Sequence, residues 1–363
     1  MIKKNFQIDP DISRAETLPG DVYCDPVWYE RTKTKIFVRS WQFVGDPARM
    51  KAPGHVRPFT LLEGCLDEPL LLTVDARGRT HCLSNVCTHR GALVVEGEGH
   101  VKNMRCRYHG RKFALDGSFL SMPEFKGVAG FPSEKDNLPR VALERWGSFL
   151  FCSLDPAFSF EELVRPMNER VNFLPLDRAV FDASTSRDYF LKANWALYCD
   201  NYVEEFHLPY VHGASLAGLD YGDYRTELYP HATLQIGVGK SKADSFALPE
   251  GHPDHGSNIA AFYYWLFPNL MMNFYLWGVS VNVVYPLGPE RTKVSFLSYV
   301  WDKNQQSSGV GADLHRVEME DEEVVESVQR GVRSRLYNRG RYSPRREVGT
   351  HHFHKLLARF LNT

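Results

Sequence analysis

The sequence predicts an α+β protein in two parts, a small all-β unit followed by a larger unit in which helices cover an antiparallel sheet. Residues 41–155 carry short apolar runs separated by Gly and Pro turns, a pattern typical of a compact β fold. Asp155-Pro156 marks a boundary, beyond which amphipathic helical segments accompany long strands between about 225 and 301. We therefore expect an N-terminal helical segment 1–40 packed with the larger unit, a β unit 41–155 and a larger unit 156–363.

Composition limits the class of protein. The 363 residues are 43% hydrophobic and carry a net charge of −1, so bulk electrostatics favour neither nucleic acid nor an anionic membrane. The most apolar stretch, 260–287, is interrupted by Pro268 and predicts strands rather than a membrane helix. An N-terminus without an apolar signal region and an odd number of scattered cysteines, seven, indicate a cytoplasmic protein with reduced thiols.

Each element follows from a local pattern. An amphipathic helix is expected over 26–40, and strands are expected at Pro69–Val74, before a turn at Asp75–Gly78, and at Phe149–Cys152. The larger unit is expected to contain, in order, a helix at 160–172, a strand at 187–192, a helix at 195–210, the long strands, a flexible loop at 302–312, a helix at 314–337 and a shorter final helix.

Two short boxes carry metal-binding residues. Cys87 and His89 form the first, and Cys106 and His109 form the second. Two thiolates with two imidazoles are the ligand set of a Rieske [2Fe–2S] cluster, with the cysteines on one iron and the histidines on the other. The same residue types also bind structural zinc, but zinc sites usually pair cysteine with cysteine and histidine with histidine. The mixed boxes favour the cluster, and zinc remains the alternative.

The residues around the boxes support tight loops. Gly91 follows the first box and Gly110 the second, where backbone must approach inorganic sulfide closely. The boxes resemble the Rieske oxygenase form rather than the respiratory form, which has an extra cysteine in each box. Ala92 and Tyr108 occupy those positions here, so the resemblance implies a lower-potential cluster that receives electrons from a reductase.

A second group of candidate ligands lies about a hundred residues downstream, at Glu204, His207 and His212. On a helix, Glu204 and His207 share a face. His207 and His212 would lie about 140° apart on a regular helix, unless Pro209 distorts it and swings His212 towards His207. The alternative is that these are two ordinary histidines at a helix end.

A site with two histidines needs a carboxylate to form the facial triad of a non-haem Fe(II) oxygenase. At 100° per residue, an apolar stripe roughly 100° wide is formed by Leu314, Val317, Val324, Val325, Val328 and Val332. The same segment carries a run of acidic residues. Asp321 falls in the middle of the stripe, whereas Glu320, Glu322, Glu323 and Glu326 fall outside it. A buried carboxylate is costly unless it is paired or metal-bound, so Asp321 is the predicted third ligand. A buried salt bridge and an incorrect helical phase are the alternatives.

Over nearly its whole length the chain resembles the oxygenase α-subunit of Rieske non-haem iron oxygenases. The motifs occur in the same order: the two boxes, Asn201-Tyr202-x-Glu204, the two histidines, and an aspartate ahead of a Gln329-Arg330-Gly331 turn. The resemblance implies a helix-grip-like catalytic domain and a mononuclear Fe(II) held by His207, His212 and Asp321, with Asn201 nearby. It also implies a head-to-tail homotrimer in which Glu204 bridges the iron site to a Rieske histidine of the next subunit.

The implied activity is that of an oxygenase component using O2. The chain has no dinucleotide fingerprint and no ferredoxin-type cysteine run, so a separate NAD(P)H-dependent reductase of flavin or ferredoxin type is expected. Two other functions are the alternatives. A plain Rieske electron carrier would need only the first 155 residues, so the long remainder argues against it. A zinc-stabilised binding module would have no redox role.

With glutamate at position 204, the motif is similar to that of the family branch whose members hydroxylate or demethylate quaternary amines such as choline, glycine betaine and carnitine. An aromatic ring-hydroxylating dioxygenase is the alternative. The strands offer eight aromatic candidates for a cation–π cage: Phe262, Tyr263, Tyr264, Trp265, Phe267, Phe274, Tyr275 and Trp277. Alternating aromatics in strands are usually core, so two or three of them at most are expected at the substrate.

Overall fold

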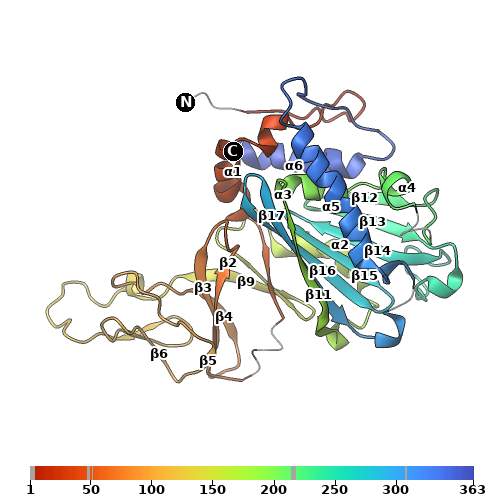
Figure 1. Cartoon of the computed structure of the whole chain (residues 1–363). Helices are drawn as coiled ribbons and strands as arrows, with labels where there is room; N and C mark the ends of the chain where they lie inside the picture. The colour runs from red at the N-terminus through yellow and green to blue at the C-terminus, as the bar shows by residue number, and fades with distance from the viewer. Residues whose placement is uncertain (1–4, 47–49, 51, 214–217, 307–308) are drawn as a thin grey trace. The chain divides into compact units, whose positions relative to one another are not determined.

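The computed structural model describes residues 5–46, 50, 52–213, 218–306 and 309–363 (Figure 1). The chain forms two compact units, one of residues 41–156 and one that joins residues 1–40 to 157–363. Among the described residues, no helix combines the length and the apolar composition that a membrane span requires.

The smaller unit is built from two antiparallel sheets. The seven-stranded sheet has the order β1-β10-β9-β4-β3-β2-β5, and the three-stranded sheet has the order β6-β7-β8. Their bounds are β1 Gln42–Gly45, β2 His55–Leu61, β3 Glu68–Val74, β4 Thr80–Ser84, β5 Gly99–His100, β6 Met104–Arg105, β7 Lys112–Phe113, β8 Phe119–Ser121, β9 Arg140–Trp146 and β10 Phe149–Ser153. The strands predicted at 69–74 and 149–152 are confirmed as β3 and β10. A core cluster that includes Leu71, Leu83 and Phe113 also contains Cys87 and Cys106, so both boxes are anchored in the hydrophobic core.

The larger unit contains a second seven-stranded antiparallel sheet, with the order β11-β17-β16-β15-β14-β13-β12. The strands are β11 Val180–Leu191, β12 Arg225–Tyr229, β13 Ala232–Val238, β14 Ile259–Leu266, β15 Leu270–Tyr275, β16 Gly278–Gly288 and β17 Arg291–Val300. The apolar stretch 260–287 therefore forms strands, as predicted. β11 begins earlier than the predicted position 187, because as an edge strand it carries exposed polar residues that hide the apolar alternation.

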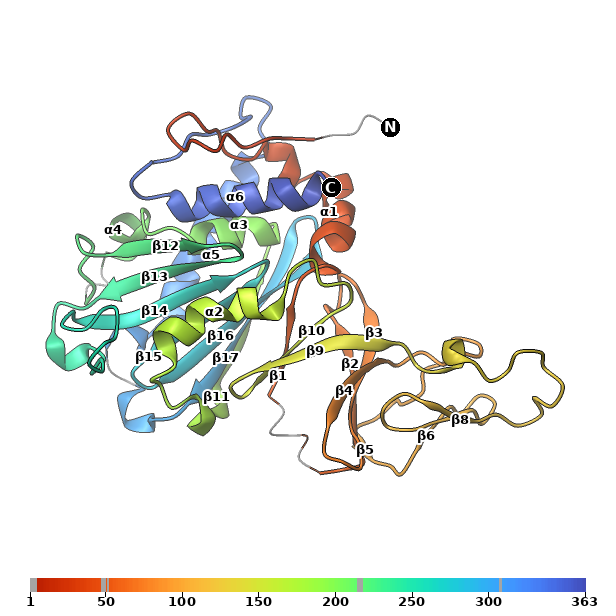
Figure 2. The same cartoon turned by 180° about the vertical axis from the view of Figure 1, so that it is seen from behind.

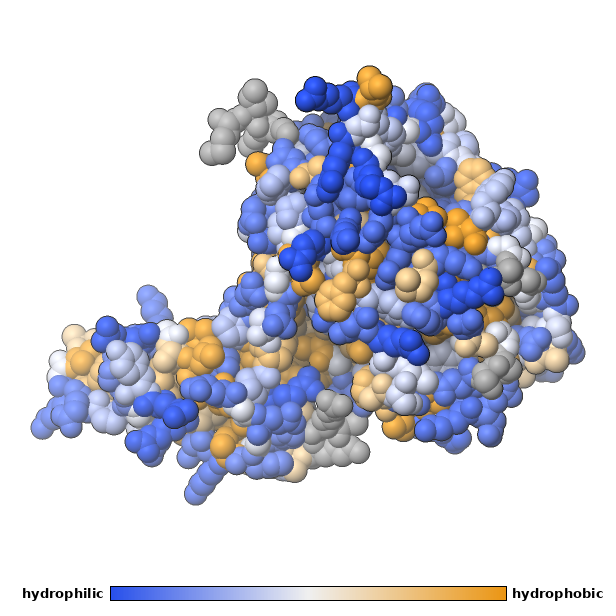
Figure 3. Space-filling model, viewed as in Figure 1, coloured by the Kyte–Doolittle hydropathy of each residue, from blue (hydrophilic) through white to orange (hydrophobic). Residues whose placement is uncertain are grey.

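Helices cover both faces of this sheet. The helices are α1 Pro26–Thr32, α2 Phe160–Val171, α3 Trp195–Tyr202, α4 Leu208–Val211, α5 Leu314–Gly331 and α6 Val348–Leu361. Figures 1 and 2 show α3 and α5 on one face and α2 on the other. The surface over α5 is mainly hydrophilic (Figure 3), as expected of an amphipathic helix whose exposed residues include Arg316, Glu323 and Arg330.

Capping explains where several helices begin. Ser159 and Glu162 form a capping box at the start of α2, which confirms the predicted helix at 160–172 apart from its last residue. Asp25 accepts a hydrogen bond from the Val27 amide at the start of α1. The helix predicted over 26–40 is shorter than expected, because α1 passes into a wider π-type turn at Lys33–Phe37 and then ends. Single 3₁₀ turns lie at Gly20–Tyr23, Glu134–Asp136, Leu176–Arg178, Lys242–Asp244, Lys303–Gln305 and Gly309–Gly311.

Two predicted helices and one predicted loop are corrected. The helix predicted over 195–210 is wrong, because α3 ends at Tyr202 and a separate short helix, α4, follows. The helix predicted over 314–337 ends at Gly331, a residue that weakens helices. The predicted loop 302–312 contains two 3₁₀ turns, and its residues 307–308 lie outside the described part of the chain.

Candidate metal centres

The two cysteine boxes fold into equivalent loops. In the first loop, the Cys87 amide donates to the Ala92 carbonyl at 2.8 Å. In the second loop, the Cys106 amide donates to the Arg111 carbonyl at 2.9 Å. In both loops the glycine amide four residues after the cysteine donates back to the cysteine carbonyl at 3.0 Å. The predicted tight loops are confirmed, and each presents one sulfur and one imidazole.

Glycine is required in both loops for conformational reasons. Gly91 has φ +73° and Gly110 has φ +75°, a region of backbone space that other residues rarely adopt. This conformation turns the chain sharply after each histidine.

The four candidate cluster ligands lie together. The rings of His89 and His109 have centroids 4.7 Å apart, and the Cys87 thiol lies against that of Cys106. Both cysteines are buried, and burial raises the pKa of Cys87, so its thiolate needs a nearby cation to persist. Desolvation and the neighbouring His109 lower the pKa of His89, which favours the neutral imidazole that a metal binds. Nδ1 of His109 is buried without a hydrogen-bond partner among the described residues, as suits a metal-binding atom.

An ion pair that the sequence did not reveal joins the two loops. Arg111, next to the second box, is buried and donates from Nη2 to Oδ1 of Asp136 at 2.6 Å. Thr88, inside the first box, donates to the carbonyl of Asp136 at 2.9 Å. Asp136 therefore holds both loops, and the Arg111 hydrogen bond and the Ser133 amide lower the pKa of its carboxyl. No local motif marks Asp136, because it lies far along the chain from both partners.

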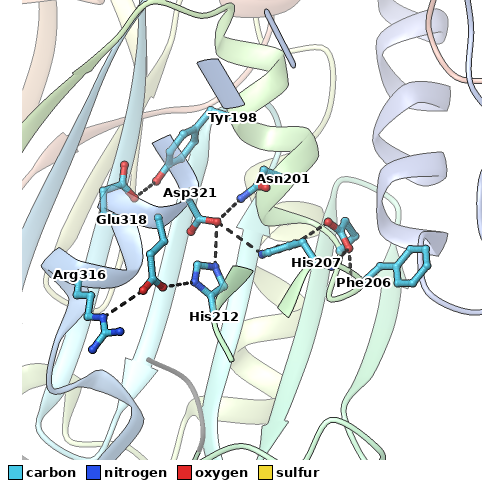
Figure 4. A network of polar contacts seen from close by, with 10 residues as sticks. Tyr198, Asn201, Phe206, His207, His212, Arg316, Glu318 and Asp321 are labelled. Atoms are coloured by element: carbon cyan, nitrogen blue, oxygen red, sulfur yellow. Dashed lines mark hydrogen bonds and ion pairs between the residues drawn. The ribbon is translucent and has the colours of Figure 1, made fainter. Parts of the chain in front are cut away.

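The second group of candidate ligands converges in the larger unit (Figure 4). One ligand atom from each of His207, His212 and Asp321 lies within 4.8 Å of the others. Oδ1 of Asp321 lies 3.0 Å from Nε2 of His212 and 3.6 Å from Nε2 of His207. Two imidazoles and one carboxylate on one side of a cavity form the donor set of a facial triad.

Each imidazole is oriented by a carboxylate at its outer nitrogen. Nδ1 of His207 lies 2.5 Å from Oε1 of Glu204, and Nδ1 of His212 lies 2.8 Å from Oε2 of Glu320. Both Nε2 atoms are thereby directed towards Asp321. Outer carboxylates of this kind fix the tautomer and orientation of metal-binding histidines. The helical phase excluded Glu320 as a ligand, and the structure places it behind a candidate ligand, in contact with His212.

Asp321 and Glu320 have further partners. Nδ2 of Asn201 donates to Oδ1 of Asp321 at 2.7 Å, which places Asn201 beside the candidate iron site as expected. Nε of Arg316 donates to Oε1 of Glu320 at 3.1 Å. Although burial disfavours its charged form, the contacts with Asp321 and Glu320 raise the pKa of His212. Because a metal binds the neutral imidazole, a proton and a metal ion compete for His212.

The local fold of the histidine segment differs from the expected continuous helix. His207 precedes α4 and His212 follows it, and their ring centroids lie 5.2 Å apart. The break lies before α4, where the Glu204 carboxylate accepts the amides of Phe206 and His207 and so competes with helical hydrogen bonding. Pro209 lies in the first turn of α4, where its missing N–H does no harm, so the predicted distortion by Pro209 is wrong.

The candidate iron site opens into a cavity with about 100 Å³ of space for water-sized guests. Helices α3 and α5 and the sheet supply its walls. The lining residues are Tyr198, Asn201, Tyr202, Glu204, His207, Leu208, His212, Leu219, Tyr224, Gln235, Tyr263, Asn273, Tyr275, Asn282, Phe296, Val310, Leu314, Val317, Glu318 and Asp321. Of the eight aromatics proposed from the sequence, Tyr263 and Tyr275 line the cavity, and the other six do not.

Aromatic rings gather along one wall of the cavity. The ring of Tyr263 lies 6.4 Å from that of Tyr224 and 5.9 Å from that of Tyr275, measured between centroids. Burial raises the pKa of all three phenols, so they stay neutral near pH 7. The sequence did not single out Tyr224, because it lies in a connection before β12 rather than in an aromatic-rich strand.

The charged groups of the lining are mostly acidic. Glu204, Glu318 and Asp321 contribute carboxyls, the two histidines contribute imidazoles, and no Lys or Arg is among the described lining residues. Such a cavity favours a cationic or neutral guest over an anionic one.

Comparison with known proteins identifies two domains in the chain. A model of the Rieske [2Fe-2S] domain matches residues 40–132, and a model of the ring hydroxylating alpha subunit (catalytic domain) matches residues 176–363. The chain is 31% identical to the chloroplastic choline monooxygenase of Arabidopsis thaliana, over 97% of this chain and 85% of that protein. It is also 31% identical to the carnitine monooxygenase oxygenase subunit of Escherichia coli (strain K12), over 99% of this chain and 96% of that protein.

Solved structures show the same fold. The quaternary ammonium Rieske monooxygenase CntA in complex with L-carnitine superposes with a TM-score of 0.77, covering 98% of this chain and 99% of that chain at 22% identity. Naphthalene 1,2-dioxygenase from Rhodococcus sp. gives a TM-score of 0.72, covering 95% of this chain and 94% of that chain at 20% identity. The predicted architecture, a Rieske domain followed by a catalytic domain of antiparallel sheet and helices, is confirmed.

Proposed function

Because the chain belongs to the family of Rieske non-haem iron oxygenase α-subunits, we propose that it is the oxygenase component of a multicomponent monooxygenase for a small quaternary amine. Members of this family are oxidoreductases with a Rieske [2Fe–2S] cluster and a mononuclear iron. They need a separate electron-transfer partner, which we propose is an NAD(P)H-dependent reductase of flavin or ferredoxin type.

We propose that Cys87, His89, Cys106 and His109 hold the cluster. Two sulfurs and two imidazole nitrogens from equivalent loops match its ligand set, and the unpartnered Nδ1 of His109 supplies a buried donor atom. The Asp136 contacts with Thr88 and Arg111 keep the loops in register.

We propose that His207, His212 and Asp321 hold the mononuclear iron, which supplies the site for O2 reduction when bound. Glu204 and Glu320 fix the two rings, and Asn201 fixes the carboxylate. The hydroxylation balances as substrate C–H plus O2, two electrons and two protons, giving C–OH and water. The two electrons come from NAD(P)H through the reductase and the Rieske centre.

Glu204 is proposed to act across a subunit interface in a homotrimer. One of its oxygens already lies 2.5 Å from Nδ1 of His207, which forms half of an imidazole–carboxylate–imidazole bridge. A Rieske histidine of a neighbouring subunit would complete it. This arrangement supports electron transfer from the Rieske centre of one subunit to the iron site of its neighbour.

The observation that carries the substrate proposal is the cavity lining: neutral phenol rings, carboxyl groups and no Lys or Arg among the described residues. A quaternary ammonium group is bound by aromatic faces and by negative charge. Among the described lining residues no Lys or Arg can pair with a substrate carboxylate, so an uncharged tail, as in choline, fits better than the carboxylate tail of carnitine or betaine. Hydroxylation next to nitrogen gives a carbinolamine that releases an aldehyde, and hydroxylation of a carbinol carbon gives an aldehyde hydrate.

A turnover assay with a surrogate reductase tests this function. NADH consumption and product formation, followed by mass spectrometry, are compared for choline, glycine betaine, carnitine and simple aromatic acids. We expect product to match NADH consumption with a quaternary amine, fastest with choline, and no product from the Asp321→Ala variant. Coupled turnover of a neutral aromatic, with all quaternary amines inert, would instead indicate a ring-hydroxylating dioxygenase.

A further inference from the structure

Glu318 is a buried carboxyl on the wall of the cavity. Its residue is 2% exposed, and it lies on α5 three positions before Asp321. Oε2 accepts a hydrogen bond from the Tyr198 hydroxyl at 2.7 Å, and the two side chains point towards each other in Figure 4. Oε1 is buried and has no hydrogen-bond partner among the described residues. Glu318 belongs to the cavity lining, and among the described residues no side chain or backbone group competes with a guest for Oε1.

The other acidic groups of this region already have partners. Glu204 contacts His207, and Asp321 contacts both histidines. Glu205, which is also buried, contacts Arg346 at 3.3 Å. Among the carboxyls of the described cavity lining, Glu318 therefore differs from Glu204 and Asp321. It contacts neither a cationic side chain nor a residue of the candidate iron site.

A buried carboxylate without a cation is unfavourable. Burial, followed by the negative charge of Asp321, raises the pKa of Glu318 well above its ordinary range, although the Tyr198 hydrogen bond opposes this. Glu322 adds a further negative charge from the same helix. Without a guest, burial therefore favours the protonated form of Glu318, and a cation beside it would favour the carboxylate.

We propose that Glu318 is a specificity-determining residue that binds the cationic head of the substrate, with Tyr198 holding its carboxyl in place. This inference rests on the proposed function and names the group that selects a cation. A quaternary ammonium ion has no N–H to donate, and its charge lies on methyl and methylene groups that contact oxygens through weak C–H···O interactions. An oxygen that no N–H or O–H of the described residues reaches, in a cavity lined by neutral phenol rings, suits such an ion.

The position of Glu318 also fits the reaction. Three residues along an α-helix correspond to a rise of about 4.5 Å, and residues so spaced share a face. An ammonium group held beside Glu318 therefore lies in the same cavity as Asp321 and over the same face of α5. Glu318 thereby directs the carbons near nitrogen to the site of oxidation.

The test compares choline with its neutral carbon isostere, 3,3-dimethyl-1-butanol, in the iron-loaded protein. Glu318→Gln keeps the size and the hydrogen bond to Tyr198 but removes the charge. We expect this variant to lose about 10- to 100-fold in affinity and kcat/KM for choline, the range for losing one interaction with a charged group. Affinity for the isostere should change little, and the Rieske spectrum and iron content should match the wild type.

The matched control is Glu322→Gln, on the same helix. Glu322 also has a buried oxygen without a partner among the described residues, and its pKa is raised to about 6 by burial and by Glu326. It is not among the described residues that line the cavity. This variant should bind choline as the wild type does. If Glu318→Gln weakens the binding of choline and of the isostere equally, or changes the binding of neither compound, Glu318 does not select the cation.

Wild-type calorimetry gives a second measurement that needs no variant. In buffers of different ionisation enthalpy, choline binding should release a proton from Glu318, whereas the isostere should release none. Equal affinity for the two compounds, with no proton released, would overturn the proposal even if the variant does not fold. If wild-type protein turns over no quaternary amine yet prefers choline in this way, the proposed function fails and the cation site stands.

Discussion

Replacing Glu320 tests whether a carboxylate outside the ligand set controls iron binding. Sequence periodicity alone would make Glu320→Ala harmless, because this residue falls outside the apolar stripe of its helix. The structure instead places Oε2 of Glu320 2.8 Å from Nδ1 of His212. We therefore expect Glu320→Ala to weaken Fe(II) binding while the Rieske cluster stays intact.

The magnitude follows from the burial of the two partners. Loss of a carboxylate that orients a metal-binding histidine costs about 10- to 100-fold in metal affinity, or about 1.4–2.7 kcal/mol. The side chain of His212 is 1% exposed, so its Nδ1 would lose its protein partner in a buried position. The Glu320 side chain is 25% exposed, so water can partly replace it. The expected loss is consequently near the lower end, about tenfold.

The assay is Fe(II) titration of the apo mononuclear site, with the visible Rieske spectrum as an internal reference. Glu323→Ala is the matched control, because Glu323 is an exposed glutamate on the same helix. We expect the control to bind iron as the wild type does. Wild-type iron affinity in Glu320→Ala would refute the argument that this carboxylate orients His212.

Three further predictions follow from the same contacts. Asp321→Ala should abolish mononuclear iron binding while the Rieske spectrum survives; iron and acid-labile sulfide analysis checks this, and retained iron would exclude Asp321 as a ligand. Glu204→Gln should keep both metals but slow oxidation of the Rieske centre in single-turnover kinetics, because Glu204 contacts His207 rather than the metal; an unchanged rate would contradict the bridge. Asp136→Asn should lower the melting temperature at pH 7, since it weakens the contact with Arg111. The folded-state pKa of Asp136 is lowered, so its stabilisation is present above the unfolded pKa of about 4 and is lost as the pH falls below it; the two melting temperatures should therefore converge in acid.

Local sequence determined the features that depend on neighbouring residues. The boxes at Cys87 and Cys106 were recognisable because the candidate cluster ligands and their glycines lie within a few positions of one another. The strands of the 260–287 stretch were recognisable because alternation with a period of two reflects the two faces of a sheet.

Helical periodicity was only partly informative for α5. It placed Asp321 on the buried side, and the structure brings Asp321 next to both histidines. However, Val328 of the predicted apolar stripe is 42% exposed, whereas Glu318 and Gln329 are almost fully buried. The buried face is therefore rotated from the predicted one, because the hydroxyl of Tyr198 on α3 offers Glu318 a hydrogen-bond partner that hydrophobicity alone does not reveal.

Only the tertiary structure decided how the ligands are supported and what the cavity contains. Asp136 joins two loops from a distant position, and Glu320 reaches a histidine 108 residues away. The cavity walls likewise combine residues from α3, α5 and several strands. The sequence by itself determined the family and the candidate ligands, because motifs depend on spacing along the chain. The supporting contacts and the charge of the cavity depend on which distant segments pack together, and packing is decided by the folded chain as a whole.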